Sequence, residues 1–144
     1  MDILLGTGLG AIRFGWSFER LVDELGAPDK TWTQEFLEGE VELKVRYNHL
    51  WATLELEENR VVGIECQSPN LVLLGRRLIG GSRATVLAFV AQQLGQVPEF
   101  EDYGNLEVYE FVESRLYLHF DYDRLVGVDF GVHWSTGDEP LWPT

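Results

Sequence analysis

One local pattern of residues occurs twice in this chain, and it limits the folds that the chain can adopt. Ser17 precedes a short run with apolar residues at helical spacing, and Gly26 follows that run. Ser82 lies 65 positions after Ser17, and it precedes a second, longer helical run that Gly95 follows. Serine caps helix N-termini, whereas glycine followed closely by proline ends helices. The sequence therefore predicts two helices with similar boundaries.

Each predicted helix is followed by segments in which polar and apolar residues alternate, as they do in strands with one buried face. The last of these segments contains Arg60 to Glu65 in the first half and Arg124 to Asp129 in the second, 64 positions later. Two matches at nearly the same offset indicate an internal duplication of a helix followed by an antiparallel meander. The predicted strands cover residues 32–37, 41–47, 50–57 and 61–66, then 106–112, 116–122 and 125–129.

These elements predict an α+β fold in which two tandem helix-plus-meander repeats form one continuous antiparallel sheet, with both helices on one face. We expect one globular unit, with the first repeat over residues 1–68 and the second over residues 69–132. Residues 133–144 form a tail with two tryptophans. The tail either folds back over the core or contributes to a partner site.

Composition narrows the classes of partner. The chain carries 24 Asp and Glu against 11 Lys and Arg, a net charge of -13, which disfavours nucleic acid and favours a basic partner. Cys66 is the only cysteine, so an internal disulfide is impossible. The start of the sequence does not resemble a signal peptide, and no apolar run is long enough for a membrane helix. We therefore expect a cytoplasmic protein without a membrane partner.

Candidate catalytic and ligand motifs are weak. Residues 6–11 resemble a dinucleotide-binding glycine pattern, but no helix begins within them, so they are expected to form turns. The three histidines lack the spacing of a metal site. Glu55, Glu57 and Glu58 are typical of a solvated strand edge, and Arg76, Arg77 and Arg83 are expected to neutralise nearby acids rather than bind an anion. We expect no enzyme activity, metal or other cofactor.

The aromatic residues suggest where a partner binds. If the inward positions of the strands face the helices, Trp51 and Tyr117 point to the opposite face of the sheet. Exposed aromatic side chains among acids are typical of protein-binding surfaces. The residues expected on this surface are Trp51, Tyr117, His119, Tyr109, Glu42 and Glu55.

The segment from Ile12 to Ser17, followed by Leu21, Gly26 and Pro28, resembles the helix motif of the beta-lactamase inhibitor protein and of the small outer-membrane assembly lipoproteins. It is also similar to small cytosolic immunity-type proteins of bacterial toxin systems and to uncharacterised bacterial families. Trp16 stands where this motif usually has methionine. The resemblance implies α-β-meander units and protein binding through an open sheet face.

Two functions remain for this chain at the level of sequence. The first is a non-enzymatic protein-binding module of the immunity or inhibitor type, whose acidic sheet face covers a basic protein. The alternative is a structural or homo-oligomeric domain that uses the same face against itself.

Overall fold

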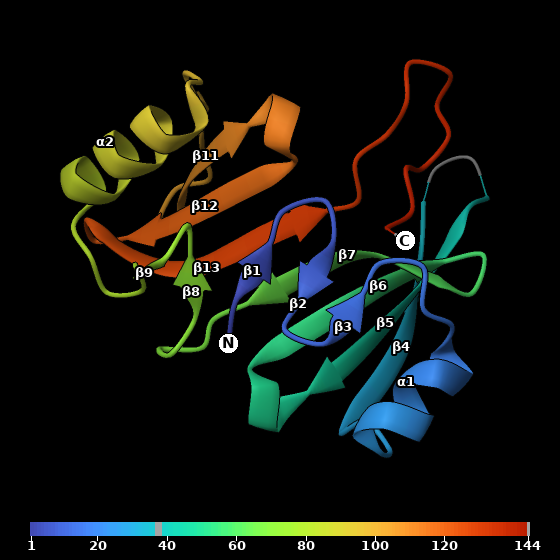
Figure 1. Cartoon of the computed structure of the whole chain (residues 1–144). Coiled ribbons are helices and arrows are strands. Elements are labelled where there is room, and N and C mark those ends of the chain that lie inside the picture. Colours follow the sequence, from blue (N-terminus) through green and yellow to red (C-terminus); the bar gives the residue numbers. More distant parts are fainter. Residues whose placement is uncertain (37–38, 144) are drawn as a thin grey trace.

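The computed structural model describes residues 1–36 and 39–143, and its largest element is an antiparallel sheet of eight strands (Figure 1). The strand order is β10-β11-β12-β13-β7-β6-β5-β4, so β4 to β7 are neighbours in chain order, as are β10 to β13. The two groups of strands meet where β7 pairs with β13. The strands are β4 (Lys30–Glu35), β5 (Val41–Tyr47), β6 (Ala52–Glu57), β7 (Arg60–Cys66), β10 (Glu99–Asp102), β11 (Glu107–Phe111), β12 (Leu116–Asp121) and β13 (Arg124–Gly131).

The helices are α1 (Phe18–Leu25) and α2 (Arg83–Leu94), as the sequence predicts. Ser17 Oγ accepts a hydrogen bond from the Arg20 N–H at 3.1 Å, and Ser82 Oγ accepts one from the Thr85 N–H at 3.4 Å. Each bond satisfies a backbone donor that has no partner within its helix. Gly26 and Gly95 follow the helices with φ of 84° and 63°, a conformation that glycine adopts without steric cost.

Short strands lie before each helix. The glycine-rich residues 6–11 form turns as expected, but residues 8 and 9 between these turns form a short strand of a small sheet. No helix begins within them. Residue 2 bridges to residue 72, which places the small sheet beside a two-stranded ribbon. These strands are β1 (Ile3–Leu4), β2 (Gly8–Leu9) and β3 (Ile12–Arg13), with β8 (Val72–Leu73) and β9 (Arg76–Arg77) in the ribbon.

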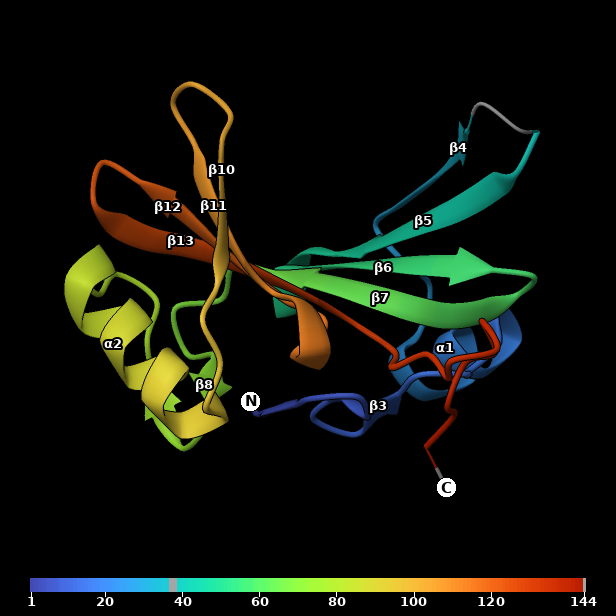
Figure 2. The ribbon, with the colours of Figure 1, turned by 90° about the horizontal axis from the view of Figure 1, so that it is seen from above.

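The core lies between one face of the large sheet and the elements packed beneath it. Leu21 from α1 and Val90 from α2 are fully buried, together with sheet residues such as Leu54, Leu118 and Phe130. Figure 2 shows both helices on the same side of the sheet, while the hairpins β4–β5 and β10–β11 rise in the opposite direction. The helix-free face is therefore curved, with β7 and β13 at its centre.

Some predicted boundaries differ in the structure. The strand predicted over residues 50–57 begins at Ala52, because η1 (Asn48–Leu50) is a 3-10 turn and Trp51 adopts a left-handed conformation with φ of 55°. A similar turn, η2 (Val112–Ser114), precedes β12. Strand β10 was not expected. Of the strand predicted over residues 32–37, residue 37 lies outside the described residues.

The tail folds back onto the body of the protein. The Leu141 N–H donates to the His133 carbonyl at 2.7 Å, and the Trp142 ring lies 5.1 Å from the Arg60 guanidinium. Trp134 and Trp142 both pack against the core cluster. Of the two alternatives for the tail, docking on the core is therefore observed for its described residues, 133–143. Within the described part of the chain, neither helix has the length and apolarity needed to span a membrane.

Candidate protein-binding face

A row of side chains crosses the helix-free face at one register, and we call it the central row. Directly opposed residues on antiparallel strands point to the same side of a sheet. The intervening residues of these strands, such as Leu54 and Leu118, are buried in the core, so the central row points away from the helices. In strand order from β5 to β11, the central row consists of Arg46, Thr53, Glu65, Asp129, Tyr117 and Glu110.

A lysine and two carboxylates form an ion cluster beside the central row. Lys44 Nζ lies 2.8 Å from Glu42 Oε1 and 2.8 Å from Glu55 Oε1. Burial lowers the pKa of Lys44, but its hydrogen bonds to the two carboxylates outweigh that effect and raise the pKa overall. The Lys44 ammonium group thus forms ion pairs with two carboxylates at a partly buried position, where an unpaired charge would destabilise the folded protein.

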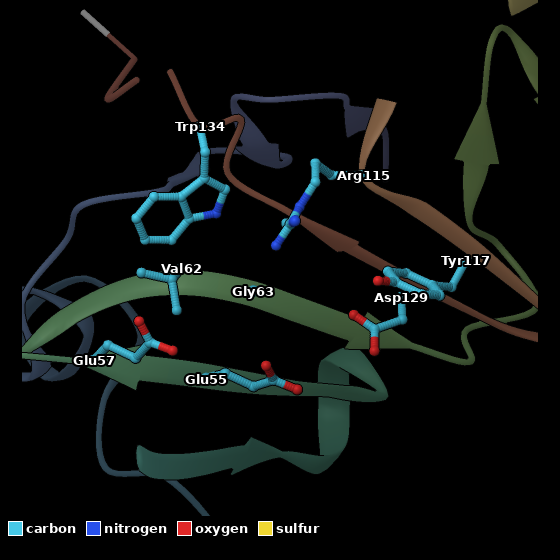
Figure 3. Close-up of a pocket in the computed structure, with 9 residues that line it drawn as sticks. Glu55, Glu57, Val62, Gly63, Arg115, Tyr117, Asp129 and Trp134 are labelled. Carbon is cyan, nitrogen blue, oxygen red and sulfur yellow. The ribbon is translucent and has the colours of Figure 1, made fainter. Parts of the chain in front are cut away.

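Between the two groups of strands the face is hollowed into a pocket of about 190 Å³ (Figure 3). Gly63 and Gly131 are directly paired across β7 and β13 and provide the floor. A Cβ added at Gly63 would lie 2.9 Å from Glu55 Oε2, so the glycine leaves room for that carboxylate. The remaining lining residues are Glu55, Glu57, Val62, Arg115, Tyr117, Asp129 and Trp134.

The pocket has a surplus of negative charge. Burial, reinforced by the charges of Glu55 and Glu65, raises the pKa of Asp129 to about 8. Partial burial and the Glu42 carboxylate raise the pKa of Glu57. Each of these shifts measures an unfavourable environment for a negative charge. A cation placed between these carboxylates would therefore be stabilised.

Two further groups of this face have shifted pKa values. Burial and a hydrogen bond to Glu110 raise the pKa of Tyr117 to about 12, so its hydroxyl stays protonated and can donate. Burial lowers the pKa of His119, and the Glu65 charge only partly opposes that effect. His119 is therefore mostly neutral near pH 7 and adds little positive charge to the face.

The comparisons with known proteins concern the fold. No family model matches this sequence, and no curated protein matches it. The fold is similar to that in the crystal structure of an extracellular protein containing a SCP domain from Bacillus anthracis str. Ames, with a TM-score of 0.50 and 16% sequence identity. That match covers 82% of this chain and 43% of the other chain, so this chain spans less than half of that protein's length. At such low identity, the likeness shows a shared fold alone.

The structure brings four of the expected surface residues onto the helix-free face. Glu42, Glu55, Tyr117 and His119 all occupy outward register positions. Trp51 is 49% exposed, but it lies in the turn between β5 and β6 rather than within a strand. It therefore stands at the margin of the face.

Tyr109 was placed on the wrong face. Its register partner is Leu118, and its ring packs against Phe100 at 4.9 Å and Phe120 at 5.7 Å between centroids, all on the helix side. The reason is the alternation in β11, where Phe111 is buried and residues two apart share a face. Val108 and Glu110 are the outward residues of this strand.

Of the residues that line the pocket, sequence reasoning named Glu55 and Tyr117 as surface residues but did not anticipate the pocket or the part of Asp129 in it. Asp129 follows the alternation of β13 and could have been assigned to the outward face, but its proximity to Glu55 depends on the pairing of β13 with β7. Glu55 was expected at a solvated strand edge, whereas it is half-buried on an inner strand and bound to Lys44. Glu57 and Glu58 are exposed.

Of the arginine cluster, Arg83 neutralises nearby acids as expected, whereas Arg76 packs on an aromatic ring. Arg83 forms ion pairs with Glu107 and with Asp123, the latter at 3.6 Å. The Arg76 guanidinium lies 4.3 Å from the centroid of the Phe89 ring. Among the described residues, no group of three or more His, Cys, Asp or Glu side chains is arranged to hold a metal ion.

Proposed function

We propose that this chain is a non-enzymatic protein-binding module of the immunity or inhibitor type, which holds a basic protein against the helix-free face of its sheet. The observation that supports this function is the environment of Asp129. It lies at the centre of the face, where burial, together with the charges of Glu55 and Glu65, raises its pKa to about 8. Near pH 7 Asp129 itself keeps its proton, so the negative charge around it belongs to Glu55 and Glu65. A surface with a surplus of such charge gains electrostatic energy when a cationic surface covers it.

The charge of the whole chain agrees with this choice of partner. A net charge of -13 attracts a positively charged protein over a distance of about one Debye length, roughly 8 Å at physiological salt. The same charge weakens the alternative of self-association through this face. Two copies docked face to face would oppose their acidic central rows, and like charges across an interface are costly.

We also propose that the chain arose by duplication, with one unit over residues 1–68 and the other over residues 69–132. Features that match at an offset of 64 positions support this. Trp51 and Arg115 are both left-handed residues that end 3-10 turns. Irregularities in strand register follow Glu55 in β6 and His119 in β12.

A capture experiment followed by a binary measurement tests the proposed function. The immobilised protein should retain a basic protein from an extract of its native host, and the purified pair should bind in calorimetry. Replacing two acids of the central row, Glu65→Gln with Glu110→Gln, should weaken that affinity about tenfold or more. The matched control replaces two exposed acids away from the face, Asp23→Asn with Glu113→Gln, and should change the affinity less than about twofold.

Equal effects of the two double variants would exclude the face as the binding surface. Light scattering across a dilution series addresses self-association. A tight dimer whose affinity changes when Glu65 and Glu110 are replaced by glutamine, but not when Asp23 and Glu113 are neutralised, would mean that a second copy of the chain covers the face. The protein would then be the homo-oligomeric domain instead.

A further inference from the structure

Resting on this proposed function, we infer that the pocket floored by Gly63 and Gly131 receives the guanidinium group of one arginine side chain of the partner protein. The pocket lies between β6 and β12, beside the centre of the helix-free face. A partner that covers the face must place something over this hollow. The chemistry of the walls specifies an arginine.

The walls offer both kinds of contact that a guanidinium makes. Figure 3 shows the carboxylates of Glu55 and Glu57 and the carboxyl group of Asp129 around the pocket, with the Tyr117 ring and the Trp134 indole at its sides. A guanidinium is planar, donates to carboxylates in pairs and stacks on aromatic rings, whereas an ammonium group acts as a point charge. The volume of about 190 Å³ is below the roughly 300–1,000 Å³ that is usual for small-molecule sites. The pocket therefore suits a single side chain.

The other half of the face already contains an arginine at the corresponding place. Arg46 Nη1 donates to Thr53 Oγ1 and to Gln67 Oε1, both at 3.1 Å. Gln67 Nε2 donates in turn to Glu65 Oε1 at 2.9 Å, so the arginine is linked to an acid of the central row. On this side of the face, a guanidinium is thus held by the chain itself.

The pocket side has the same positions, but its guanidinium comes from a different residue: Arg115 Nε lies 3.9 Å from where a Cβ on Gly131 would stand. Counted outward from the β7–β13 pair, the central row has Glu65, Thr53 and Arg46 on one side. On the other side it has Asp129, Tyr117 and Glu110. Glu110 lies 64 positions after Arg46, so an acid replaces the arginine. Gly131 lies 64 positions after Gln67, so a residue without a side chain replaces the glutamine. The glycine leaves the pocket open at the position where Gln67 binds the Arg46 guanidinium in the other half.

Arg115 is the one basic residue that lines the pocket. Figure 3 shows its side chain extending between Trp134 and Tyr117. It is exposed, and it forms no ion pair with any of residues 1–36 or 39–143. Its positive charge opposes the entry of a second cation. Removing that charge should therefore strengthen arginine binding, an effect opposite in sign to that of removing the carboxylates.

A nuclear magnetic resonance titration tests the pocket directly. The probe is Nα-acetyl-arginine methylamide, added to about 50 mM at constant ionic strength because a single side chain binds with millimolar affinity at best. The indole N–H of Trp134 and the amides of Gly63 and Gly131 should shift and saturate. The neutral control is the citrulline analogue, which has nearly the same shape and should bind at least about fivefold more weakly.

Variants make the test specific to this pocket. Gly63→Ala adds a methyl group to the floor and displaces the Glu55 carboxylate, so the saturable shifts should be lost. The matched control is Gly127→Ala, the corresponding position 64 residues later, where the added Cβ would lie 3.3 Å from Gln67 Cγ; it should leave probe binding unchanged. Glu55→Gln should weaken binding about threefold or more, and Arg115→Gln should tighten it. Dispersed amide spectra confirm that each variant is folded.

The inference is overturned if citrulline produces the same saturable shifts as arginine, if Gly63→Ala and Gly127→Ala behave alike, or if the probe does not shift these signals. It is also overturned if the purified partner binds the Gly63→Ala variant as tightly as the unaltered protein. In that case the capture of a basic partner would still support the proposed function. If the central-row acids do not affect partner binding, the proposed function fails independently of what the pocket binds.

Discussion

At the scale of single residues, Asp129 is the most informative group in the protein. Its pKa of about 8 lies well above the usual value for an aspartate, near 3.9. The folded protein therefore keeps a proton that the unfolded chain loses near pH 4, so folding becomes less favourable as the pH rises between these values. Burial is the main cause of this shift, and the charges of Glu55, Glu65, Glu42 and Lys44 also contribute. Tyr117 lies directly opposite Asp129, and Arg115 lines the pocket beside Gly131.

This reasoning predicts that Asp129→Asn stabilises the protein in alkaline solution. The amide cannot acquire the charge that Asp129 acquires above about pH 8, so the free energy of unfolding at about pH 9 should rise by about 1–3 kcal/mol. Near pH 3 the carboxyl is mostly protonated in both states, and the effect should nearly vanish. Urea denaturation at both pH values measures the difference, with Asp23→Asn as the exposed control. A gain of equal size at both pH values would contradict the assignment.

At the scale of elements, the two outermost strands explain why the sheet ends where it does. All residues of β4 and β10 are exposed. Lys30 and Glu35 lie at the ends of β4, and β10 carries Glu99, Glu101 and Asp102. Charged side chains on an edge strand discourage pairing with the sheet of another molecule. The described edges are thus less suited to binding than the helix-free face.

The serine caps of α1 and α2 can also be tested by substitution. Ser17→Ala and Ser82→Ala should each lower the free energy of unfolding by about 1 kcal/mol, because each removes the acceptor for a backbone N–H of the first turn. Urea denaturation measures this loss. Ser17→Asp retains an acceptor and places a negative charge at the helix N-terminus, so it should preserve most of the stability. A loss as large as that of Ser17→Ala would show that the cap is not what stabilises α1.

At the scale of the whole molecule, the net charge of -13 governs how a partner arrives. Association with the basic partner should slow by about tenfold between low salt and about 0.5 M salt, whereas dissociation should change much less. Stopped-flow tryptophan fluorescence can follow both rates, since Trp51 and Trp134 lie at the margin of the face and in the pocket. The Glu65→Gln with Glu110→Gln variant should show a shallower salt dependence. A rate independent of salt would exclude electrostatic attraction of the partner.

Much of the local structure follows from short-range patterns. Ser17 and Ser82 predict the starts of both helices, and the alternation in residues 116–121 assigns Leu118 to the core and Tyr117 to the open face. The same pattern was less informative in β11, where Tyr109 was assigned outward. Strand β10 was missed because its four exposed residues show no buried alternation. The position of Trp51 depends on a left-handed turn that nothing in the neighbouring sequence predicts.

The sequence by itself determined the helices, most strands and the face on which most of their residues lie, because caps, glycines and period-two alternation act over a few positions. Only the tertiary structure decided which strands join the two meanders. Pairing of β7 with β13 brings Asp129 next to Glu65 and near Glu55, and the folded tail brings Trp134 to the same pocket. The alternation of polar and apolar residues indicates the face of the sheet on which a side chain lies, but it does not indicate which side chains of other strands lie next to it. The pocket and the shifted pKa of Asp129 arise from residues that are distant in sequence, so they exist only in the folded chain.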